Sequence, residues 1–225
     1  MVRRYNPHML GAIRSAFVSQ RQSRALQREI IRLRKELAQS QQYSFTADWM
    51  TNRLEDWRQD FAKFAGLPGL RMLEIGSYEG RSAVWFLENI LTHPTSRLVC
   101  IDPFFDPTRE IRFDHNINLC QAQGRVEKRH AGSETVLHRL EKSSFDLIYV
   151  DGAHEAPAVL FDAMLSWDLL KPGGLLVFDD YQWQPNRPPE QRPQLAIDLF
   201  LRSHARRYNL VRQAYQVVIE KKEGE

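Results

Sequence analysis

The sequence has few cysteines and no long apolar run, and both absences narrow the class of protein. Cys100 and Cys120 are the only cysteines among 225 residues. Cys100 lies inside an apolar segment, so we expect a buried thiol there rather than a disulfide or a metal ligand. No apolar stretch approaches the roughly 20 residues that span a bilayer. Arg14 interrupts the segment 9–18, which therefore lacks the apolar centre of a secretory signal. Together these features predict an intracellular, cytoplasmic protein without a membrane span.

Acidic residues are scarce at the start of the chain. Residues 1–40 hold nine Lys and Arg against two Glu, a net charge of +7, which leaves −4 for the rest of a chain of net charge +3. Residues 8–40 have helical periodicity, but the apolar spacing from Leu26 to Leu37 covers only about two heptads, too few to predict a coiled coil. We interpret residues 1–40 as a basic helical extension.

Several roles for this extension stay open. A solvated helix, or one that forms a homo-oligomer, is the reading we favour. A basic arm for nucleic acid or an anionic membrane is the functional alternative. A mitochondrial transit peptide is a third, because residues 1–28 contain Arg and Ser but no acidic residue.

Apolar runs alternate with helical segments through the rest of the chain. We expect strands at 71–75, 97–101, 125–130, 145–150, 174–178, 208–212 and 215–220, with helices at 80–92, 108–120, 133–141, 155–169 and 194–204. Such alternation predicts a parallel sheet with helices on both faces. The last two strands are joined too closely to be parallel, so they must pair antiparallel. Residues 41–225 are thus predicted to form an α/β domain with a Rossmann-like seven-stranded sheet, mostly parallel and ending in an antiparallel hairpin.

Two segments of this domain are expected beside a binding site. Residues 41–65 are unusually aromatic at helical spacing, so most of their rings should pack on the domain while one or two cover a pocket. The proline-rich stretch 184–193 follows a strand end, where α/β proteins bind their ligands.

A glycine-containing turn follows the first expected strand. The strand breaks at Gly76, and the chain passes through Gly80 into an apolar helix. Glycines let a backbone approach a ligand closely, and the helix start offers free N–H groups. A second apolar run ends in Asp102, 22 residues after Gly80, where a carboxylate can accept both hydroxyls of a ribose. This pattern predicts a site for a nucleoside cofactor.

The turn departs from the dinucleotide-binding pattern. Its glycines are spaced Gly-x-x-x-Gly, so the strict Gly-x-Gly-x-x-Gly spacing is absent. Glu74, at the end of the first strand, would repel a pyrophosphate but tolerates a cationic cofactor. S-adenosylmethionine, which carries a sulfonium and an ammonium group, fits this requirement.

Three carboxylates follow two later strands. Asp151 ends the fourth strand, and Asp179 and Asp180 end the fifth. Adjacent parallel strands end at one sheet edge, so these side chains should converge and raise one another's pKa unless a cation neutralises them. Oxygen ligands suit Mg²⁺ or Mn²⁺. The alternative is that Asp180 caps a turn while Asp151 accepts backbone hydrogen bonds. His154 lies three residues after Asp151, and its ordinary pKa of about 6.5 suits a general base.

These residues together resemble the class I S-adenosylmethionine-dependent methyltransferases. More narrowly, residues 43 to 220 are similar to the metal-dependent O-methyltransferases of the catechol and macrocin types and to the bacterial family with an Asp-Gly-x-His motif. The resemblance implies a cofactor site, a metal site and a catalytic pair, with the following members: Glu74, Gly76, Ser77, Tyr78, Gly80, Ser82, Asp102, Ser133 and Asp151 for the cofactor; Asp151, Asp179 and Asp180 for Mg²⁺ or Mn²⁺; His154 and Asp151 for catalysis. His154 falls where catechol enzymes place a lysine, so its role as base is a point of departure from that family.

The resemblance implies transfer of a methyl group to a metal-bound hydroxyl of a small molecule or glycan. Two alternatives remain. A nucleic-acid methyltransferase tethered by the basic arm is disfavoured, because Asp-Gly-Ala-His replaces the Asn/Asp-Pro-Pro-aromatic motif of many amino-methylating enzymes. A non-catalytic cofactor-binding protein is compatible with the same fold.

Overall fold

The computed structural model describes residues 7–223, with side chains from residue 22 onward. The chain divides into two compact units, Met1–Gln42 and Tyr43–Glu225. This division lies two residues after the predicted boundary. The transit-peptide alternative rests partly on residues 1–6, which lie outside the described residues.

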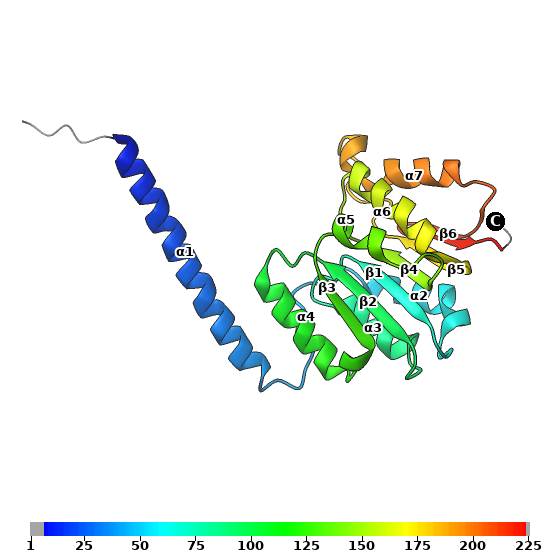
Figure 1. The fold of residues 1–225 in the computed structure, drawn as a ribbon, viewed down its shortest axis with the longest axis horizontal. Coiled ribbons are helices and arrows are strands. Elements are labelled where there is room, and N and C mark those ends of the chain that lie inside the picture. The colour runs from blue at the N-terminus through cyan, green and yellow to red at the C-terminus, as the bar shows by residue number, and fades with distance from the viewer. Residues whose placement is uncertain (1–6, 224–225) are drawn as a thin grey trace, which may run out of the picture. The chain divides into compact units, whose positions relative to one another are not determined.

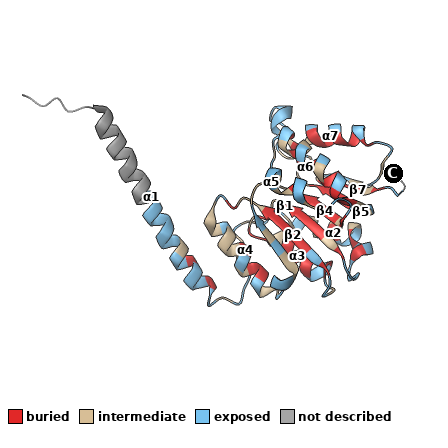
Figure 2. Cartoon of the chain, in the orientation of Figure 1, coloured by how far each residue is buried: buried red, intermediate tan, exposed pale blue. Residues whose placement is uncertain are grey.

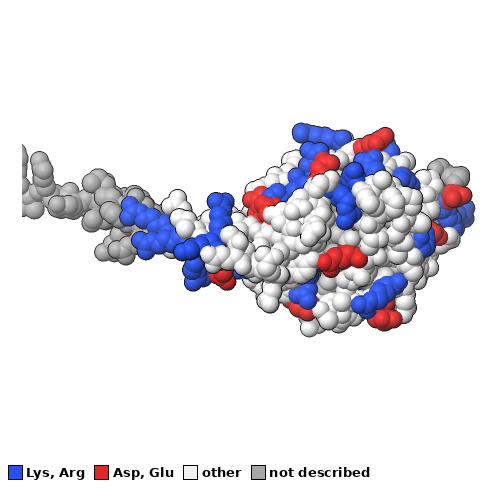
Figure 3. Space-filling model, turned by 90° about the horizontal axis from the view of Figure 1, so that it is seen from below, with Lys and Arg blue, Asp and Glu red and all other residues white. Residues whose placement is uncertain are grey.

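The first unit contains one long helix, α1 (Pro7–Leu37). Over its described side chains, lysine and arginine outnumber acidic residues, and Figure 3 shows them along this helix, whereas residues of both charge signs are interspersed on the second unit. Within residues 7–223 we find no helix long and apolar enough to cross a membrane.

A seven-stranded sheet organises the second unit (Figure 1). Its strands are β1 (Arg71–Ile75), β2 (Arg97–Asp102), β3 (Val126–His130), β4 (Phe145–Val150), β5 (Leu170–Phe178), β6 (Tyr208–Gln213) and β7 (Val217–Lys221). The strand order is β3-β2-β1-β4-β5-β7-β6. Strands β1 to β5 pair in parallel, while β7 pairs antiparallel with both β5 and β6. The predicted fold class is confirmed.

Helices cover both faces of this sheet, because successive strand residues alternate between the faces. Their bounds are α2 (Leu54–Asp60), α3 (Arg81–Asn89), α4 (Pro107–Leu119), α5 (Ser133–Val136), α6 (Ala156–Leu169) and α7 (Pro193–Ser203). One core contains Met72 of β1 and apolar side chains of α2, α3 and α4; the other contains Leu73 and side chains of α6 and α7. Figure 2 shows the buried strands between these layers.

Three elements differ from the expected ones. The helix expected over 133–141 is split into α5 and a 3-10 turn at Leu137–Arg139, and β5 begins at Leu170, four residues early. The aromatic segment 41–65 forms 3-10 turns at Thr51–Arg53 and Ala62–Phe64 on either side of α2 rather than one helix. Its periodicity came from rings that must reach the core, Trp57, Phe61 and Phe64 among them.

We predict that the basic extension is dispensable for folding and cofactor binding, because the sheet and both its helical layers lie in residues 43–225. Deletion of residues 1–38 should leave the thermal midpoint and the S-adenosylhomocysteine affinity unchanged within a factor of about two, by calorimetry. Light scattering on the same sample will show whether the oligomeric state falls. A folded truncation that no longer binds the cofactor product would contradict this prediction.

Candidate cofactor and acceptor site

A cavity of about 1140 Å³ opens at the carboxyl ends of β1, β2, β4 and β5. This volume lies above the usual range for one small-ligand site, so it has room for a cofactor and a second molecule. The predicted site residues that line it are Gly76, Ser77, Tyr78, Ser82, Asp102, Ser133, Asp151, His154, Asp179 and Asp180. Glu74 and Gly80 are not among its lining residues.

Glu74 is fully buried behind the cavity, where it holds β1 to the start of α3. It accepts a hydrogen bond from Ser82 Oγ at 2.6 Å and a longer one from Cys100 Sγ at 3.5 Å. Burial raises the pKa of its carboxyl group. A negative charge here would attract the cationic end of a nearby ligand. The hydrogen bonds that Glu74 makes in the structure are all to other residues of the protein, and its side chain does not line the cavity.

Gly76 is required by a neighbouring strand as well as by the turn. Its φ is +88°, and a Cβ atom there would lie 2.0 Å from the Asp151 carbonyl oxygen and 2.7 Å from Gly152 Cα. The Asp151 N–H donates to the Ile75 carbonyl at 2.8 Å, which closes the two strand ends against each other. The sequence predicts that this glycine gives clearance to a ligand, whereas its closest constraint in the structure is the backbone after β4.

Asp102 is oriented by two backbone donors at the end of β2. Its Oδ2 accepts from Tyr78 N at 2.8 Å, and its Oδ1 accepts from Phe104 N at 2.7 Å. Tyr78 and Phe104 have φ values of +48° and +42°, which non-glycine residues seldom adopt and which cost energy. Each carboxylate oxygen keeps a free lone pair, so Asp102 can still accept hydrogen bonds from two ribose hydroxyls.

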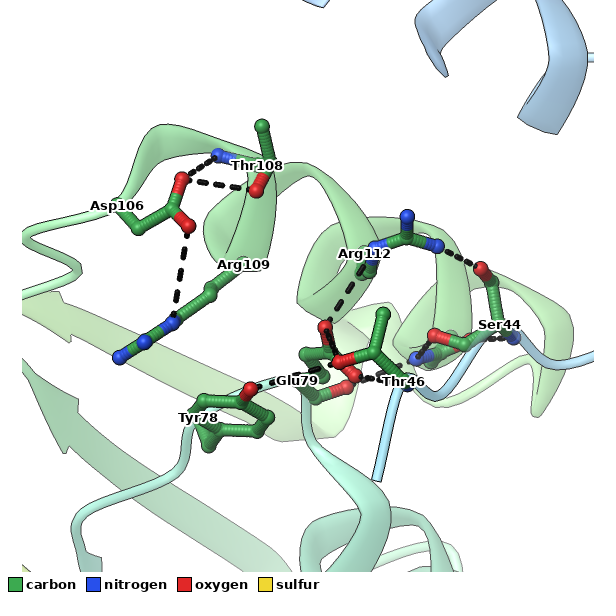
Figure 4. Close-up of polar contacts among 9 residues, drawn as sticks. Ser44, Thr46, Tyr78, Glu79, Asp106, Thr108, Arg109 and Arg112 are labelled. Atoms are coloured by element: carbon green, nitrogen blue, oxygen red, sulfur yellow. Dashed lines mark hydrogen bonds and ion pairs between the residues drawn. The ribbon is translucent and has the colours of Figure 1, made fainter.

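The segment after Gln42 is fastened to the cofactor turn by Glu79 (Figure 4). Glu79 is 2% exposed and accepts from Thr46 N at 2.6 Å and from Thr46 Oγ1 at 2.8 Å. Arg112 of α4 lies 3.4 Å from the same carboxylate. Asn116 completes the fastening: it accepts from Ser44 N at 2.7 Å and donates to the Glu79 carbonyl at 2.8 Å.

This fastening places part of the aromatic segment at the cavity. Phe45, Trp49, Met50 and Trp57 line it, which is more of these side chains than the one or two expected to cover a pocket. Trp49 is 73% exposed and lies 5.2 Å from the Tyr78 ring, so it forms part of the cavity mouth.

Asp151 and Asp179 are buried carboxylates on neighbouring strands. Burial raises the pKa of Asp151 well above its usual value, and the charges of Asp179, Asp180 and Glu74 raise it further. Burial followed by the Asp180 charge also raises the pKa of Asp179. This is the convergence of carboxylates that the positions of Asp151, Asp179 and Asp180 at neighbouring strand ends predict. A cationic ligand near Asp151 would be stabilised by the same charges.

Asp179 is surrounded by hydrogen-bond donors. Tyr149 donates its hydroxyl to Oδ2, Gln216 Nε2 donates to the same atom at 2.9 Å, and the Asp180 N–H donates to Oδ1 at 2.6 Å. Gln216 is itself held by Trp57 Nε1, which donates to its Oε1 at 2.7 Å. The buried core under α2 thus fixes the orientation of Asp179.

Asp180 joins His154 to Tyr215. His154 Nε2 lies 2.7 Å from Asp180 Oδ2, and the Tyr215 hydroxyl donates to Oδ1 at 2.7 Å. The hydrogen bond to Asp180 raises the pKa of His154. The Trp183 ring stacks on the imidazole at a centroid distance of 4.4 Å. Asp180 has a φ of +59°, a strained value that the pair of contacts holds in place.

The three carboxylates predicted to bind a divalent cation are arranged differently in the structure. Among the residues that the structure describes, no group of three or more His, Cys, Asp or Glu side chains is placed to hold a metal ion. The oxygens of Asp179 and Asp180 instead accept hydrogen bonds from Tyr149, Gln216 and Tyr215 and meet His154. In this arrangement the side chains do not fit the ion, and a metal at Asp151, Asp179 and Asp180 stays a prediction.

Sequence reasoning missed several residues of the site. Tyr149 could have been predicted from the sequence. It lies two positions before Asp151, so the two side chains point to the same side of the strand. Tyr215 and Gln216 come from the turn between β6 and β7, and Glu79 and Asn116 pair with a segment more than 30 residues away. No local pattern reports such pairings.

Residues 73–181 match a family described as a methyltransferase domain. This stretch contains the turn after β1, Asp102, the turn before α5 and the acidic ends of β4 and β5, all of which line the cavity. Residues 73–181 therefore match a methyltransferase domain, in agreement with the resemblance to class I S-adenosylmethionine-dependent methyltransferases seen in the sequence.

Relatives of known structure share the fold at low identity. An O-methyltransferase from Bacillus cereus in complex with S-adenosylhomocysteine has a TM-score of 0.61 at 18% identity, covering 84% of this chain and 90% of the other. The O-methyltransferase TomG from Streptomyces achromogenes, in complex with S-adenosylmethionine, has a TM-score of 0.60 at 17% identity and covers 84% and 89%. A methyltransferase of Podospora anserina, PaMTH1, has a TM-score of 0.59 at 19% identity over 99% of both chains.

A relative in sequence is the uncharacterized protein R132 of Acanthamoeba polyphaga mimivirus. It is 29% identical over 128 residues, which are 53% of this chain and 57% of the viral protein. The chain therefore matches little more than half of that protein's length.

We predict that Asp102 contributes to cofactor affinity through the ribose. Asp102→Asn keeps the shape of the side chain but removes the charge, so S-adenosylhomocysteine affinity should fall about ten- to a hundredfold, as expected for charged hydrogen bonds of about 1.5–3 kcal/mol. Isothermal calorimetry measures this change. Asp106→Asn is the matched control, because Asp106 caps α4 outside the cavity and asparagine caps a helix equally well. Equal affinity in the two variants would remove the ribose assignment.

Proposed function

We propose that this protein transfers a methyl group from S-adenosylmethionine to a hydroxyl group of a small molecule or glycan, with His154 as the general base. The observation that carries the proposal is the His154–Asp180 pair at a cavity that also contains Asp102 and the turn after β1. Two structural neighbours are described as O-methyltransferases, with S-adenosylhomocysteine and S-adenosylmethionine bound, which supports the choice of oxygen as the acceptor atom.

The cofactor would lie across the carboxyl ends of β1, β2 and β4. Its ribose hydroxyls would meet Asp102, and its adenine would lie against the turn at Gly132 and Ser133. The sulfonium and ammonium groups would lie toward Asp151, where the neighbouring negative charges of Asp179, Asp180 and Glu74 would attract positive charge. The acceptor would occupy the part of the cavity between Trp49, Trp183 and Tyr215.

The chemistry of the proposed step needs one base and correct alignment. The acceptor oxygen attacks the methyl carbon in line with the C–S bond, so the C–O bond forms as the C–S bond breaks and S-adenosylhomocysteine leaves. With Nε2–H donated to Asp180, the imidazole keeps an unprotonated Nδ1 that can take the hydroxyl proton. Asp180 then stabilises the imidazolium that forms, and Tyr215 keeps Asp180 in position.

We predict that replacement of His154 lowers turnover without changing cofactor affinity. His154→Gln should reduce kcat by about 10²–10⁴, the usual contribution of a positioned general base. Labelled S-adenosylmethionine with a panel of phenolic and sugar hydroxyls measures turnover, and calorimetry measures S-adenosylhomocysteine binding. His138→Gln is the matched control, because His138 lies in the 3-10 turn after α5 and does not line the cavity. If the wild-type protein binds S-adenosylhomocysteine but methylates no acceptor of the panel, the result would favour the non-catalytic alternative.

The metal prediction is decided by a separate experiment. A cation bound by Asp151, Asp179 and Asp180 would share the Asp180 oxygens with His154 and Tyr215, whereas the described arrangement supplies the base without an ion. We therefore predict that wild-type turnover survives EDTA and that added Mg²⁺ or Mn²⁺ changes kcat less than about threefold, well below the several kcal/mol that a catalytic Lewis acid supplies. Abolished turnover in EDTA, restored by Mg²⁺, would return the three carboxylates to the role that the sequence indicated.

A further inference from the structure

One cationic side chain in the cavity has no acidic partner. Three arginines line the cavity: Arg53, Arg81 and Arg109. Arg81 pairs with Asp48 at 2.9 Å, and Arg109 lies 3.8 Å from Asp106. In the described part of the chain, the guanidinium of Arg53 makes no ion pair and no hydrogen bond, and its Nε atom is enclosed without a partner.

Arg53 lies on the side of the cavity away from the ribose acid. Its Cζ atom lies 4.1 Å from the centroid of the Tyr215 ring, whose hydroxyl donates to Asp180. Tyr215 lies in the turn just before β7, and β7 lies beside β5 in the sheet. Asp102 ends β2, which β1, β4 and β5 separate from β7. Arg53 therefore borders the space left for the acceptor rather than the space for adenosine.

The backbone and the ring hold this guanidinium in a restricted position. The Arg53 N–H donates to the Met50 carbonyl at 2.8 Å and closes the 3-10 turn. Stacking on Tyr215 restricts the side chain further. A restricted guanidinium loses little entropy when it binds, and its fork of N–H groups matches the two oxygens of a carboxylate or phosphate.

Arg53 is not placed here to neutralise a carboxylate of the protein. Asp180, the acidic group nearest to the Tyr215 hydroxyl, already accepts from that hydroxyl and meets His154. Arg53 lies over the face of the ring and makes no ion pair with this carboxylate. The terminal nitrogens of Arg53 have no hydrogen-bond partner among the described residues, and an oxygen of a ligand in the cavity would supply one.

We propose that Arg53 binds an anionic oxygen group, a carboxylate or a phosphate, on the methyl acceptor. The inference rests on the proposed function, because the acceptor hydroxyl is placed beside His154 while its acidic group meets Arg53. The acceptor class is thus a hydroxylated acid or a phosphorylated alcohol rather than a neutral phenol or sugar.

The test compares matched ligands on the full-length protein saturated with S-adenosylhomocysteine. One arm pairs hydroxylated aromatic and sugar carboxylic acids with their primary amides; the second pairs phosphate monoesters with their parent alcohols. Binding is measured by ligand-observed NMR and calorimetry. We expect the anionic member of at least one arm to bind about ten- to a hundredfold more tightly, the range of charge-assisted hydrogen bonds. The arm with the larger ratio identifies the group.

Three variants locate the effect. Arg53→Gln should abolish the preference for the anion, and Arg53→Lys should retain part of it, because lysine keeps the charge but not the fork. Arg58→Gln is the matched control: it removes one positive charge from exposed Arg58 of α2, 3.7 Å from Glu55, and should leave the preference intact. Equal binding of acids and amides and of phosphates and alcohols, or a preference that survives Arg53→Gln, would overturn the proposal.

The carboxylate of the cofactor itself is the remaining competitor for Arg53. S-adenosylhomocysteine is therefore compared with 5′-methylthioadenosine, which lacks the amino-acid part. We expect the affinity ratio of these two ligands to be the same in wild type and Arg53→Gln. A selective loss of S-adenosylhomocysteine affinity would assign Arg53 to the cofactor and overturn the acceptor proposal. Wild-type protein that binds neither ligand would contradict the proposed function instead, so the two failures are distinguishable.

Discussion

The contact between the ends of β1 and β4 is the constraint on which the site depends. The Asp151 N–H meets the Ile75 carbonyl, and Gly76 leaves no side chain to separate the two backbones. Because the strands close at this point, the turn after β1 and the acidic end of β4 face one cavity. A larger residue at Gly76 would clash with backbone atoms, which cannot rotate away as a side chain does, and its φ of +88° would be strained as well.

Strained backbone conformations near the ends of β1, β2 and β5 are each accompanied by a hydrogen bond to an aspartate. Positive φ values at non-glycine residues occur beside Asp102, at Tyr78 and Phe104, and at Asp180 itself. In each case a hydrogen bond to an aspartate accompanies the strained residue, so the carboxylates hold the loops in shape while the loops aim the carboxylates. Buried carboxylates with raised pKa values add a second cost, which a cationic ligand offsets.

Sequence patterns predicted the fold and part of the site for physical reasons. The strand–helix alternation, Asp102 at a strand end and the acidic ends of β4 and β5 are local features, and a parallel sheet brings strand ends together. Sequence spacing does not report which donors a carboxylate will meet. Asp179 and Asp180 were expected to need a cation, yet Tyr149, Tyr215 and Gln216 supply hydrogen bonds from residues that no periodicity connects to them. Glu74 was read as facing the cofactor, but its bond to Ser82 turns it into the core.

The hydrogen bonds between Thr46 and Glu79 also connect two parts of the cavity wall. Glu79 is part of the turn after β1 that lines the cavity, and the segment it holds leads to the residues at the mouth of the cavity. A displacement of the turn is therefore transmitted to the wall of the acceptor space through two short hydrogen bonds and the Asn116 bridge. Such a linkage ties the shape of the acceptor side of the cavity to the position of the turn after β1, so the two halves of the cavity are built as one unit.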